Sequence, residues 1–336
     1  MQASSGEVTA IIPVWNRRDL LERLLCALPK QSYPIAEVVV VDDGSSDGSA
    51  EMAERMGARA ARLGAHRGFA AAVNRGIQES HTPLLAIVNN DVELAPDWLE
   101  KLAVTLGPEV WFVTGRILQS GAPELIDATY DALCRGCTSW RMGHGRADGP
   151  AFRAPRIIAS APFTAALFRA ELFDGVGPLD ERFESYLEDV DFGLRCASAG
   201  RAGKYVPDAL AWHHGSATLG RWHPETVRLI ARNQLFLAAK HYPARMLWRY
   251  LYPIIVAQGL WGLVALRHGQ GWAWLQGKWE GLRRSTEFRS PGPRRLTNSL
   301  PKILRENERD IRRVQREAGG DLYWALYFLL TGGGTK

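Results

Sequence analysis

Short apolar runs alternate with amphipathic stretches through the first half of the chain. Val8–Val14, Glu37–Val41 and Leu84–Val88 have the length and the composition of buried strands. The second run contains four consecutive valines, which indicates burial on both faces and therefore a parallel sheet. Residues 18–28 place leucines at the period of a helix that covers such a sheet. The alternation predicts an α/β fold with a doubly wound, mostly parallel sheet.

Further elements follow from the same patterns. Strands are expected at Arg59–Leu63, Val110–Thr114, Ala165–Arg169 and around Tyr205–Trp212, and helices at Asp47–Met56, Phe69–Gln78, Pro96–Leu106 and Ser185–Ala199. Residues 119–156 lose this periodicity and are rich in glycine, which favours a long irregular segment such as a functional lid. After residue 222 the pattern changes to long helices, at Glu225–His241, Pro243–Leu266, Trp272–Arg284, Lys302–Glu317 and Tyr323–Leu330, with a break at Ser290–Arg295. We therefore predict two regions, residues 1–222 and residues 223–336, of which the second is helical.

Charge is divided unequally between these regions. Residues 1–220 carry 21 Lys and Arg against 28 Asp and Glu, a net charge of −7, whereas residues 221–320 carry 19 against 7, a net charge of +12. Seven of the twelve tryptophans also lie after residue 220. A basic, Trp-rich surface is typical of peripheral binding to an anionic membrane, although a solvated basic face with buried tryptophans would have the same composition. Residues 245–266 include Arg249, Pro253 and Gln258, so they favour a helix in the membrane plane over a span of about 20 apolar residues.

The N-terminal residues 1–7 contain neither a basic start nor an apolar stretch, so we expect a cytoplasmic chain with reduced cysteines. The chain has four cysteines, and two of them form a single CxxC pair at Cys134 and Cys137. A structural zinc site usually needs a second pair. We interpret these two residues as incidental thiols in a loop.

Aromatic or acidic side chains follow three of the predicted strands. In an open α/β sheet, ligands bind at the carboxyl ends of the strands, so Trp15, Asp43 and Asp91 should converge on one crevice. Trp15 would stack on a nucleobase, with a position in the core as the alternative. Asp43 is the acid that we expect to accept a hydrogen bond from uracil, thymine or ribose, whereas Asp47 is explained by the start of a helix. Together these residues suit a nucleotide diphosphate.

Two clusters suggest metal ligands. Asp91 ends the sequence Asn89-Asn90-Asp91, and its carboxylate can bind Mg²⁺ or Mn²⁺ beside a diphosphate, with an Asx turn as the structural alternative. His213 and His214 follow a late strand and could contact a metal or phosphate. Adjacent residues of an extended segment point to opposite sides, so only one of the two can face the site.

A pair of acids suggests a catalytic base. Glu188 and Asp189 begin a predicted helix, where the dipole favours the ionised carboxylate, and an ionised carboxylate in a cleft can take a proton from a sugar hydroxyl. Ordinary acids at a helix N-terminus are the structural alternative. Asp191 and Arg195 are spaced i,i+4 and are expected to form a structural pair.

In their order along residues 8–245, these motifs resemble glycosyltransferase family 2, and within it the rhamnosyltransferase-like branch of bacterial surface-polysaccharide enzymes. The matching segments are Pro-Val-Trp-Asn at 13–16, Val-Val-Asp-Asp-Gly-Ser-Ser-Asp at 40–47, Gly-Phe-Ala-Ala-Ala-Val-Asn-Arg-Gly at 68–76, Asn-Asn-Asp-Val at 89–92, Glu-Asp-Val-Asp-Phe-Gly-Leu-Arg at 188–195 and Trp-His-His-Gly-Ser at 212–216. The resemblance implies a glycosyltransferase-A type fold and an inverting displacement on a TDP-, UDP- or GDP-sugar.

The resemblance also implies roles for individual residues. Asp189 would be the catalytic base with Glu188 beside it, and Asp91 and His213 would bind Mg²⁺ or Mn²⁺. The implied donor-binding residues are Pro13, Trp15, Asp43, Gly68, Phe69, Asn74 and Asn90. The chain departs from the family pattern twice: the usual Asp-x-Asp is Asn89-Asn90-Asp91, and His66 replaces a frequent Asn before the Gly-Phe pair.

The leading hypothesis is a metal-dependent, inverting sugar transferase that works peripherally at the inner face of a bacterial cell membrane. Its acceptor would be lipid-linked or a polysaccharide in cell-surface glycan synthesis, and the branch it resembles favours rhamnose as the sugar. A nicotinamide oxidoreductase is disfavoured because no G-x-G-x-x-G follows the first strand. A non-catalytic, nucleotide-binding scaffold on the same fold is disfavoured by the intact Glu188, Asp189 and Asp91. We expect no nucleic-acid partner, because clustered tryptophans and in-plane helices favour lipid.

Overall fold

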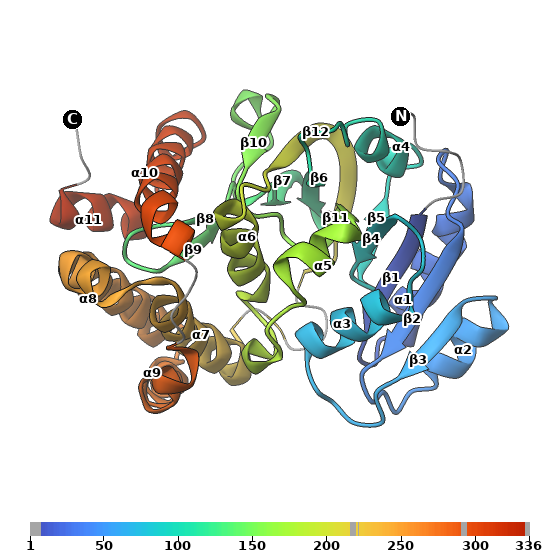
Figure 1. Cartoon of the computed structure of the whole chain (residues 1–336), viewed down its shortest axis with the longest axis horizontal. Helices are drawn as coiled ribbons and strands as arrows, with labels where there is room; N and C mark the ends of the chain where they lie inside the picture. The colour runs from blue at the N-terminus through green and yellow to red at the C-terminus, as the bar shows by residue number, and fades with distance from the viewer. Residues whose placement is uncertain (1–7, 216–219, 221, 290–293, 333–336) are drawn as a thin grey trace.

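A ten-stranded sheet forms the centre of the protein (Figure 1). The structure, a computed structural model, describes residues 8–215, 220, 222–289 and 294–332. The strands are β1 (Val8–Val14), β2 (Glu37–Asp42), β3 (Arg59–Arg62), β4 (Leu84–Val88), β5 (Val92–Leu94), β6 (Phe112–Gln119), β7 (Ala122–Ala128), β10 (Arg156–Ile158), β11 (Ala165–Arg169) and β12 (Gly203–His213). Their order is β10-β12-β6-β11-β4-β1-β2-β3, with β5 attached to β12 and β7 to β6.

The predicted glycosyltransferase-A type, mostly parallel sheet is confirmed. Strand β1 runs parallel to β2 and β4, with Ile11 opposite Val39 and Ile87. Strand β11 lies antiparallel between β4 and β6, and β12 is parallel to β6. The carboxyl ends of β1, β2, β4, β6 and β12 therefore meet at one edge of the sheet.

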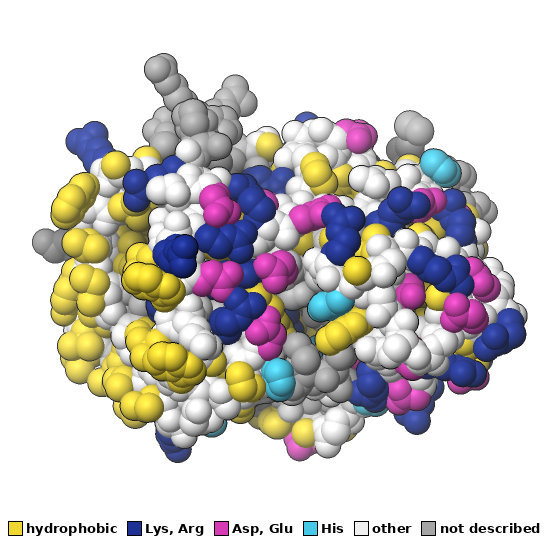
Figure 2. Space-filling model, turned by 90° about the horizontal axis from the view of Figure 1, so that it is seen from below, with side chains coloured by type: hydrophobic (Ala, Val, Ile, Leu, Met, Phe, Trp, Pro, Cys, Tyr) yellow, Lys and Arg dark blue, Asp and Glu magenta, His cyan; other side chains and the backbone are white. Residues whose placement is uncertain are grey.

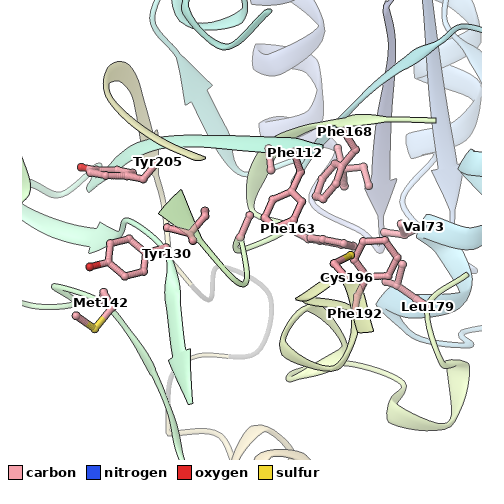
Figure 3. Close-up of a cluster of buried hydrophobic side chains, with 14 of the residues drawn as sticks. Val73, Phe112, Tyr130, Met142, Phe163, Phe168, Leu179, Phe192, Cys196 and Tyr205 are labelled. Atoms are coloured by element: carbon pink, nitrogen blue, oxygen red, sulfur yellow. The ribbon is translucent and has the colours of Figure 1, made fainter. Parts of the chain in front are cut away.

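Helices cover both faces of the sheet because the strands alternate their side chains between the faces. Ala10 and Ile12 of β1 pack with α1 (Arg18–Ala27), α2 (Ser49–Arg55) and α4 (Trp98–Ala103). Ile11 faces the other side, where α3 (Phe69–Glu79), α5 (Glu171–Val176) and α6 (Glu188–Ser198) lie. A Cβ at Gly76 would come 2.3 Å from the Ile11 side chain, so α3 rests directly on β1. Figure 3 shows the aromatic centre of this second layer, where Phe163 packs edge-on against Phe168.

Residues 119–156 contain more regular structure than we expected. They form all of β7, β8 (Asp131–Leu133) and β9 (Ser139–Arg141), and a short 3₁₀ helix at Pro150–Phe152. Strand β5 was also missed. A three-residue strand shows no periodicity, and it is held by partners far along the chain, so a pattern search does not detect it.

The C-terminal part is helical, as predicted. Its helices are α7 (Pro224–His241), α8 (Ala244–Arg267), α9 (Gly271–Arg284), α10 (Arg294–Glu317) and α11 (Leu322–Thr331). Residues 290–293 of the predicted break lie outside the described residues. The helices share hydrophobic clusters with the first region, since Phe236 packs with Phe183 and Tyr327 lies in the main core. The boundary at residue 222 stays a prediction.

The two thiols of the CxxC pair lie in the loop between β8 and β9, as expected, but they are buried in the core. Cys134 and Cys137 are 0% and 1% exposed, and the Cys137 N–H closes a turn on the Cys134 carbonyl at 3.0 Å. The Cys137 thiol donates to the carbonyl of Gln234 in α7 at 3.3 Å. Burial raises the pKa of the Cys134 thiol to about 12. These cysteines therefore help to join the C-terminal helices to the first region.

Candidate active site

Hydrogen bonds join the carboxyl ends of β1 and β2. The Asn16 N–H donates to Ser45 Oγ at 2.8 Å, and the Ser46 N–H donates to Asn16 Oδ1 at 3.0 Å. Asn16 and Arg17 adopt the left-handed conformation, with φ of 60° and 63°, so the chain turns sharply before α1. Trp15 is thereby held, half-buried, at the edge of the sheet where the parallel strands end.

Asp43 fixes the loop that precedes α3. Its carboxylate accepts hydrogen bonds from the N–H groups of Arg67 at 2.6 Å and Gly68 at 2.9 Å, and Nδ1 of His66 lies 2.8 Å from Oδ2. Burial raises the pKa of Asp43, and these three donors oppose the rise. The carboxylate lies at the sheet edge where the sequence predicts it. It binds the protein's own loop, so its contact with a nucleobase stays a prediction.

Gly68, Phe69 and Asn74 connect this loop to the segment before α6. Gly68 has φ of 93°, and a Cβ there would lie 2.9 Å from the Glu184 carbonyl, so only glycine fits. Phe69 packs against the main core. The Asn74 side chain bonds to the N–H and the carbonyl of Leu179, at 2.8 and 2.9 Å. These residues shape the loop, and their contact with a donor stays a prediction.

Two further residues that we predicted to bind the nucleotide-sugar donor lie on the same edge of the sheet. Asn90 follows β4, and its Nδ2 lies 3.4 Å from the Asn16 carbonyl, so it links the ends of β4 and β1. Pro13 is buried within β1, between β2 and β4.

Asp91 and His213 come together at the ends of β4 and β12. His213 Nε2 lies 3.2 Å from Asp91 Oδ1, and its Nδ1 lies 2.9 Å from Asp127 Oδ2 in β7. The side chain of His214 turns away to Glu93, 2.8 Å from its carboxylate. His213 is therefore the histidine of the pair that faces the site.

The charges of His213, Asp91 and Asp127 stabilise this arrangement. Burial alone would lower the pKa of His213, but hydrogen bonds to Asp127 and Asp91 raise it to about 9. Burial opposes the ionisation of Asp127, yet His213 lowers the pKa of that carboxyl to about 2. The pKa of Asp91 is also lowered by His213 in spite of burial. Without a metal ion, the three groups form an imidazolium between two carboxylates.

The Asp91–His213 pair fits a divalent ion as two of its ligands. Carboxylate oxygen and imidazole nitrogen both bind Mn²⁺, and Mg²⁺ is often held by one or two carboxylates and substrate phosphates. Asp127 occupies Nδ1 of the ring, as the carboxylate partner of a metal-bound histidine usually does. Within the residues that the structure describes, no group of three or more His, Cys, Asp or Glu is arranged to hold an ion. Water or the diphosphate of a bound donor would complete the coordination.

Three buried carboxylates surround Arg141. Glu188 and Asp189 begin α6, and Asp131 begins β8 directly opposite Arg141 of β9. The charge of Arg141 acts on all three carboxylates and on Asp127, whose Oδ2 lies 3.7 Å from the guanidinium. Glu188 Oε2 and Asp131 Oδ2 are buried without a hydrogen-bond partner among the described residues.

Burial raises the pKa of all three carboxylates. Burial, and then the charge of Asp189, raise the pKa of Glu188 and of Asp131 well above the ordinary range. Burial also raises the pKa of Asp189, but Arg141 and the Val190 N–H, 2.8 Å from Oδ1, oppose the rise. Arg141 and the Val190 N–H thus favour the ionised form of Asp189, the form that a general base needs.

The turn before α6 is strained and is held by α7. Glu184, Tyr186 and Leu187 are all left-handed, with φ between 62° and 70°, a conformation that costs about 1–3 kcal/mol for each such residue. The buried side-chain amide of Asn233 donates to three carbonyls of this turn, those of Phe183 (2.9 Å), Ser185 (2.9 Å) and Tyr186 (2.7 Å).

The predicted pair of Asp191 and Arg195 is present, with Arg195 Nε 3.0 Å from Asp191 Oδ2. Asp191 also binds two residues of α7 that the sequence did not indicate, Lys240 at 2.9 Å and His241 at 2.7 Å. Helix α6, which carries the candidate base, is thus fixed to α7 along its first turns.

The family model described as "Glycosyl transferase family 2" matches residues 9–176, which is half of the chain. The chain belongs to this family. It is 29% identical over 272 residues to an N-acetylglucosaminyl-diphospho-decaprenol L-rhamnosyltransferase of Mycobacterium tuberculosis, covering 70% of this chain and 86% of the relative. It is 32% identical over 227 residues to a pre-mycofactocin glycosyltransferase of the same organism, covering 65% of this chain and 45% of the relative.

Solved glycosyltransferases share the fold. The mannosyltransferase PcManGT of Pyrobaculum calidifontis, in complex with GDP-Man and Mn²⁺, superposes with a TM-score of 0.52 at 18% identity, covering 97% of this chain and 87% of that one. GalNAc-T7 with UDP, GalNAc and Mn²⁺ superposes with a TM-score of 0.59 at 14% identity, covering 84% and 55%. At these identities the likeness concerns the fold alone.

Sequence reasoning missed three residues of the candidate site, namely Asp127, Asp131 and Arg141. All three lie in the segment that we expected to be irregular. One signal was available, since Asp127 and Asp131 interrupt the largely apolar run from Ile126 to Leu133. A carboxylate in a buried strand requires a charged or hydrogen-bonding partner.

Proposed function

We propose that this glycosyltransferase moves a sugar from a nucleotide-diphosphate donor to a lipid-linked or polysaccharide acceptor, with inversion at the sugar's C1. The observation that carries the proposal is the series of contacts His213–Asp127–Arg141. It links the pair suited to a metal–diphosphate group with the buried carboxylates around Asp189. A leaving-group site and a base are thereby held in one cluster, as a single displacement requires.

In the proposed reaction, Asp189 takes the proton of an acceptor hydroxyl while the hydroxyl oxygen attacks C1. The bond from C1 to the diphosphate oxygen breaks, and the nucleoside diphosphate leaves with the electron pair. Because attack comes from the side opposite the leaving group, the configuration at C1 inverts. General-base catalysis of this kind contributes a factor of about 10²–10⁴.

Asp91 and His213 would hold Mg²⁺ or Mn²⁺, which offsets the charge that develops on the leaving diphosphate. With the ion bound, Asp127 would accept from the Nδ1–H of His213 and so hold the tautomer in which Nε2 is the ligand. Arg141 favours the ionised form of Asp189.

The rhamnosyltransferase relative supports rhamnose as the first sugar to test and a polyprenyl-diphosphate-linked sugar as the first acceptor. This chemistry would serve the synthesis of a cell-surface glycan. Purified protein would be incubated with TDP-, UDP- and GDP-sugars and Mg²⁺ or Mn²⁺, and nucleotide release would be measured with and without acceptor.

We expect one donor to release its nucleotide in an acceptor-dependent way, and NMR of the product to show inversion. Asp189→Asn should bind that donor without turnover. Asp97→Asn, which removes a more exposed carboxylate paired with Lys101, serves as the control and should stay active. Donor binding without any release by the wild type would instead support the scaffold alternative.

We also propose that the protein works peripherally at the inner face of the cell membrane, bound through α8, α9 and α11. Figure 2 shows hydrophobic side chains gathered on the side where the C-terminal helices lie. Trp248, Trp272 and Trp279 are 77%, 71% and 66% exposed. Tryptophan at this exposure, near basic residues such as Arg245 and Arg249, is suited to the headgroup region of an anionic bilayer.

Helix α8 is long and apolar enough to cross a membrane by length and composition. Its contacts favour an in-plane orientation. One stripe, which includes Tyr250, Ala257 and Gln258, is buried against the protein, and Gln258 Nε2 donates to the Gly136 carbonyl at 2.9 Å. The opposite stripe is exposed and apolar, with Ile255 60% and Leu263 63% exposed. A helix with one docked face and one apolar face is typical of a monotopic surface.

Part of the basic charge is not available to lipid. Arg232 is buried and pairs with Glu184 at 2.7 Å, and Lys240 pairs with Asp180 at 2.7 Å. The apolar contribution should therefore exceed the electrostatic one. We expect sedimentation with anionic vesicles that high salt weakens without abolishing, and loss of binding when Trp248, Trp272 and Trp279 are replaced by serine. Equal binding to neutral and anionic vesicles would refute the electrostatic part, and no binding to either would refute the whole.

A further inference from the structure

The imidazole of His66 makes two specific contacts at the ends of β1 and β2. Its ring is stacked on Trp15, with centroids 4.0 Å apart and planes 17° from parallel. Its Nδ1 lies 2.8 Å from Asp43 Oδ2. These are the two interactions that the proposed donor requires of this site, a flat ring on Trp15 and an N–H directed at Asp43.

The histidine and a nucleobase exclude one another at this position. The Asp43 side chain is only 4% exposed, and its carboxylate also accepts from the Arg67 and Gly68 N–H groups. Together with His66, these groups fill three of the roughly four acceptor positions of a carboxylate. While His66 covers Trp15 and Asp43, a nucleobase cannot reach the Asp43 carboxylate from solvent.

We propose that His66 occupies the nucleobase position in the nucleotide-free protein, and that the base of the donor displaces it. The inference rests on the proposed donor binding. His66 is then a determinant of nucleotide affinity and selectivity, because the base must make a better stack and a better hydrogen bond than the imidazole does. Only a nucleobase with an N–H directed at Asp43 can replace both the stack on Trp15 and the hydrogen bond to Asp43.

The imidazole can leave without unfolding the loop. The His66 side chain is 48% exposed, whereas the backbone on its C-terminal side is fixed to Asp43 by the two N–H bonds. A rotation of the side chain toward solvent therefore vacates both the face of Trp15 and the position on Asp43. The loop that leads into α3 keeps its conformation.

The test compares nucleotide affinity in the full-length wild type, in His66→Ala and in His81→Ala, which removes an exposed histidine away from the site. Calorimetry would measure the Kd of UDP, TDP and GDP with Mn²⁺. We expect His66→Ala to bind the preferred nucleotide about fivefold to tenfold more tightly. In this variant the nucleobase does not have to displace an imidazole before it binds. His81→Ala should match the wild type.

A second readout follows the ring itself. Nucleotide should increase the reaction of His66 with diethyl pyrocarbonate in the wild type, because the displaced ring is in solvent, and mass spectrometry of the modified peptide measures this. Weaker or unchanged binding by His66→Ala, or protection of His66 by nucleotide, would overturn the inference. If wild type and both variants bind no nucleotide, the proposed donor binding fails as well, an outcome distinct from a wild type that binds while His66 plays no part.

Discussion

The affinity of the Asp91–His213 pair for Mn²⁺ should rise steeply with pH from about 7 to about 9. His213 must be neutral to ligate a metal ion, since the proton and the metal compete for Nε2. Burial opposes the protonated form, but hydrogen bonds to Asp127 and Asp91 raise the pKa of His213 to about 9. Below that pKa the free site is mostly protonated, so metal binding has to release the proton; above it the competition disappears.

The magnitude follows from this pKa. Each pH unit below it costs about 1.36 kcal/mol of metal binding. At pH 7, roughly two units below, the cost is about 2.7 kcal/mol, which corresponds to an apparent Kd about 100-fold weaker than at high pH. The apparent Kd should therefore fall about tenfold per pH unit and then level off near pH 9.

Free Mn²⁺ would be measured by electron paramagnetic resonance, under argon, with protein at several pH values from about 7 to about 9.5. His213→Gln removes the titrating ligand and should abolish the slope. His214→Gln is the matched control, because His214 faces Glu93 and not Asp91, and it should keep the slope. A Kd of the wild type that does not change across this range, or an equal slope in His213→Gln, would refute the reasoning.

Three other expectations concern the candidate base, the candidate metal site and the turn before α6. Asp189→Asn should lose a factor of about 10² or more in turnover with donor affinity nearly unchanged, and Glu188→Gln should stay active; steady-state kinetics would show the reverse if the base were Glu188. Asp127→Asn should weaken Mn²⁺ binding about 10–100-fold at pH near 9.5, where proton competition is absent and only the orientation of His213 is tested. Asn233→Ala leaves three carbonyls of a strained turn without their donor and should lower the free energy of unfolding by about 1–3 kcal/mol in urea titrations. Unchanged stability with full activity would show that the turn keeps its conformation without Asn233.

The sequence predicted the sheet well because its central strands carry their own signal. Leu84–Val88 and Ala165–Arg169 form strands with the predicted bounds, and the Val8–Val14 strand does as well. Each is a largely apolar run, and all but Arg169 of these residues are buried, so burial and pattern coincide. The aromatic and acidic residues that follow such runs, Trp15 and Asp91 among them, could be predicted to share one site because parallel strands end at a common edge.

The rest of the site could not be predicted because it depends on contacts between distant parts of the chain. Asp127 becomes part of the site only through His213, 86 residues away. Arg141 is recognised only once β8 and β9 pair and set it opposite Asp131. Neither contact leaves a local pattern. The position of His66 on Trp15 is of the same kind, since it depends on how the loop before α3 folds back over β1.

The C-terminal helices also support the candidate base, besides carrying the proposed lipid surface. The candidate base begins α6 directly after a turn whose left-handed residues would relax in isolation. Helix α7 holds that turn through Asn233 and holds the first turns of α6 through Lys240 and His241, which both bind Asp191. Helix α7 is followed directly by α8, whose exposed stripe is part of the proposed lipid surface. The base and that surface therefore belong to one packed unit. In the proposed membrane-bound enzyme, a lipid-linked acceptor would meet Asp189 at a fixed height above the bilayer, and removal of the helices after residue 222 would release the candidate base as well as the proposed membrane contact.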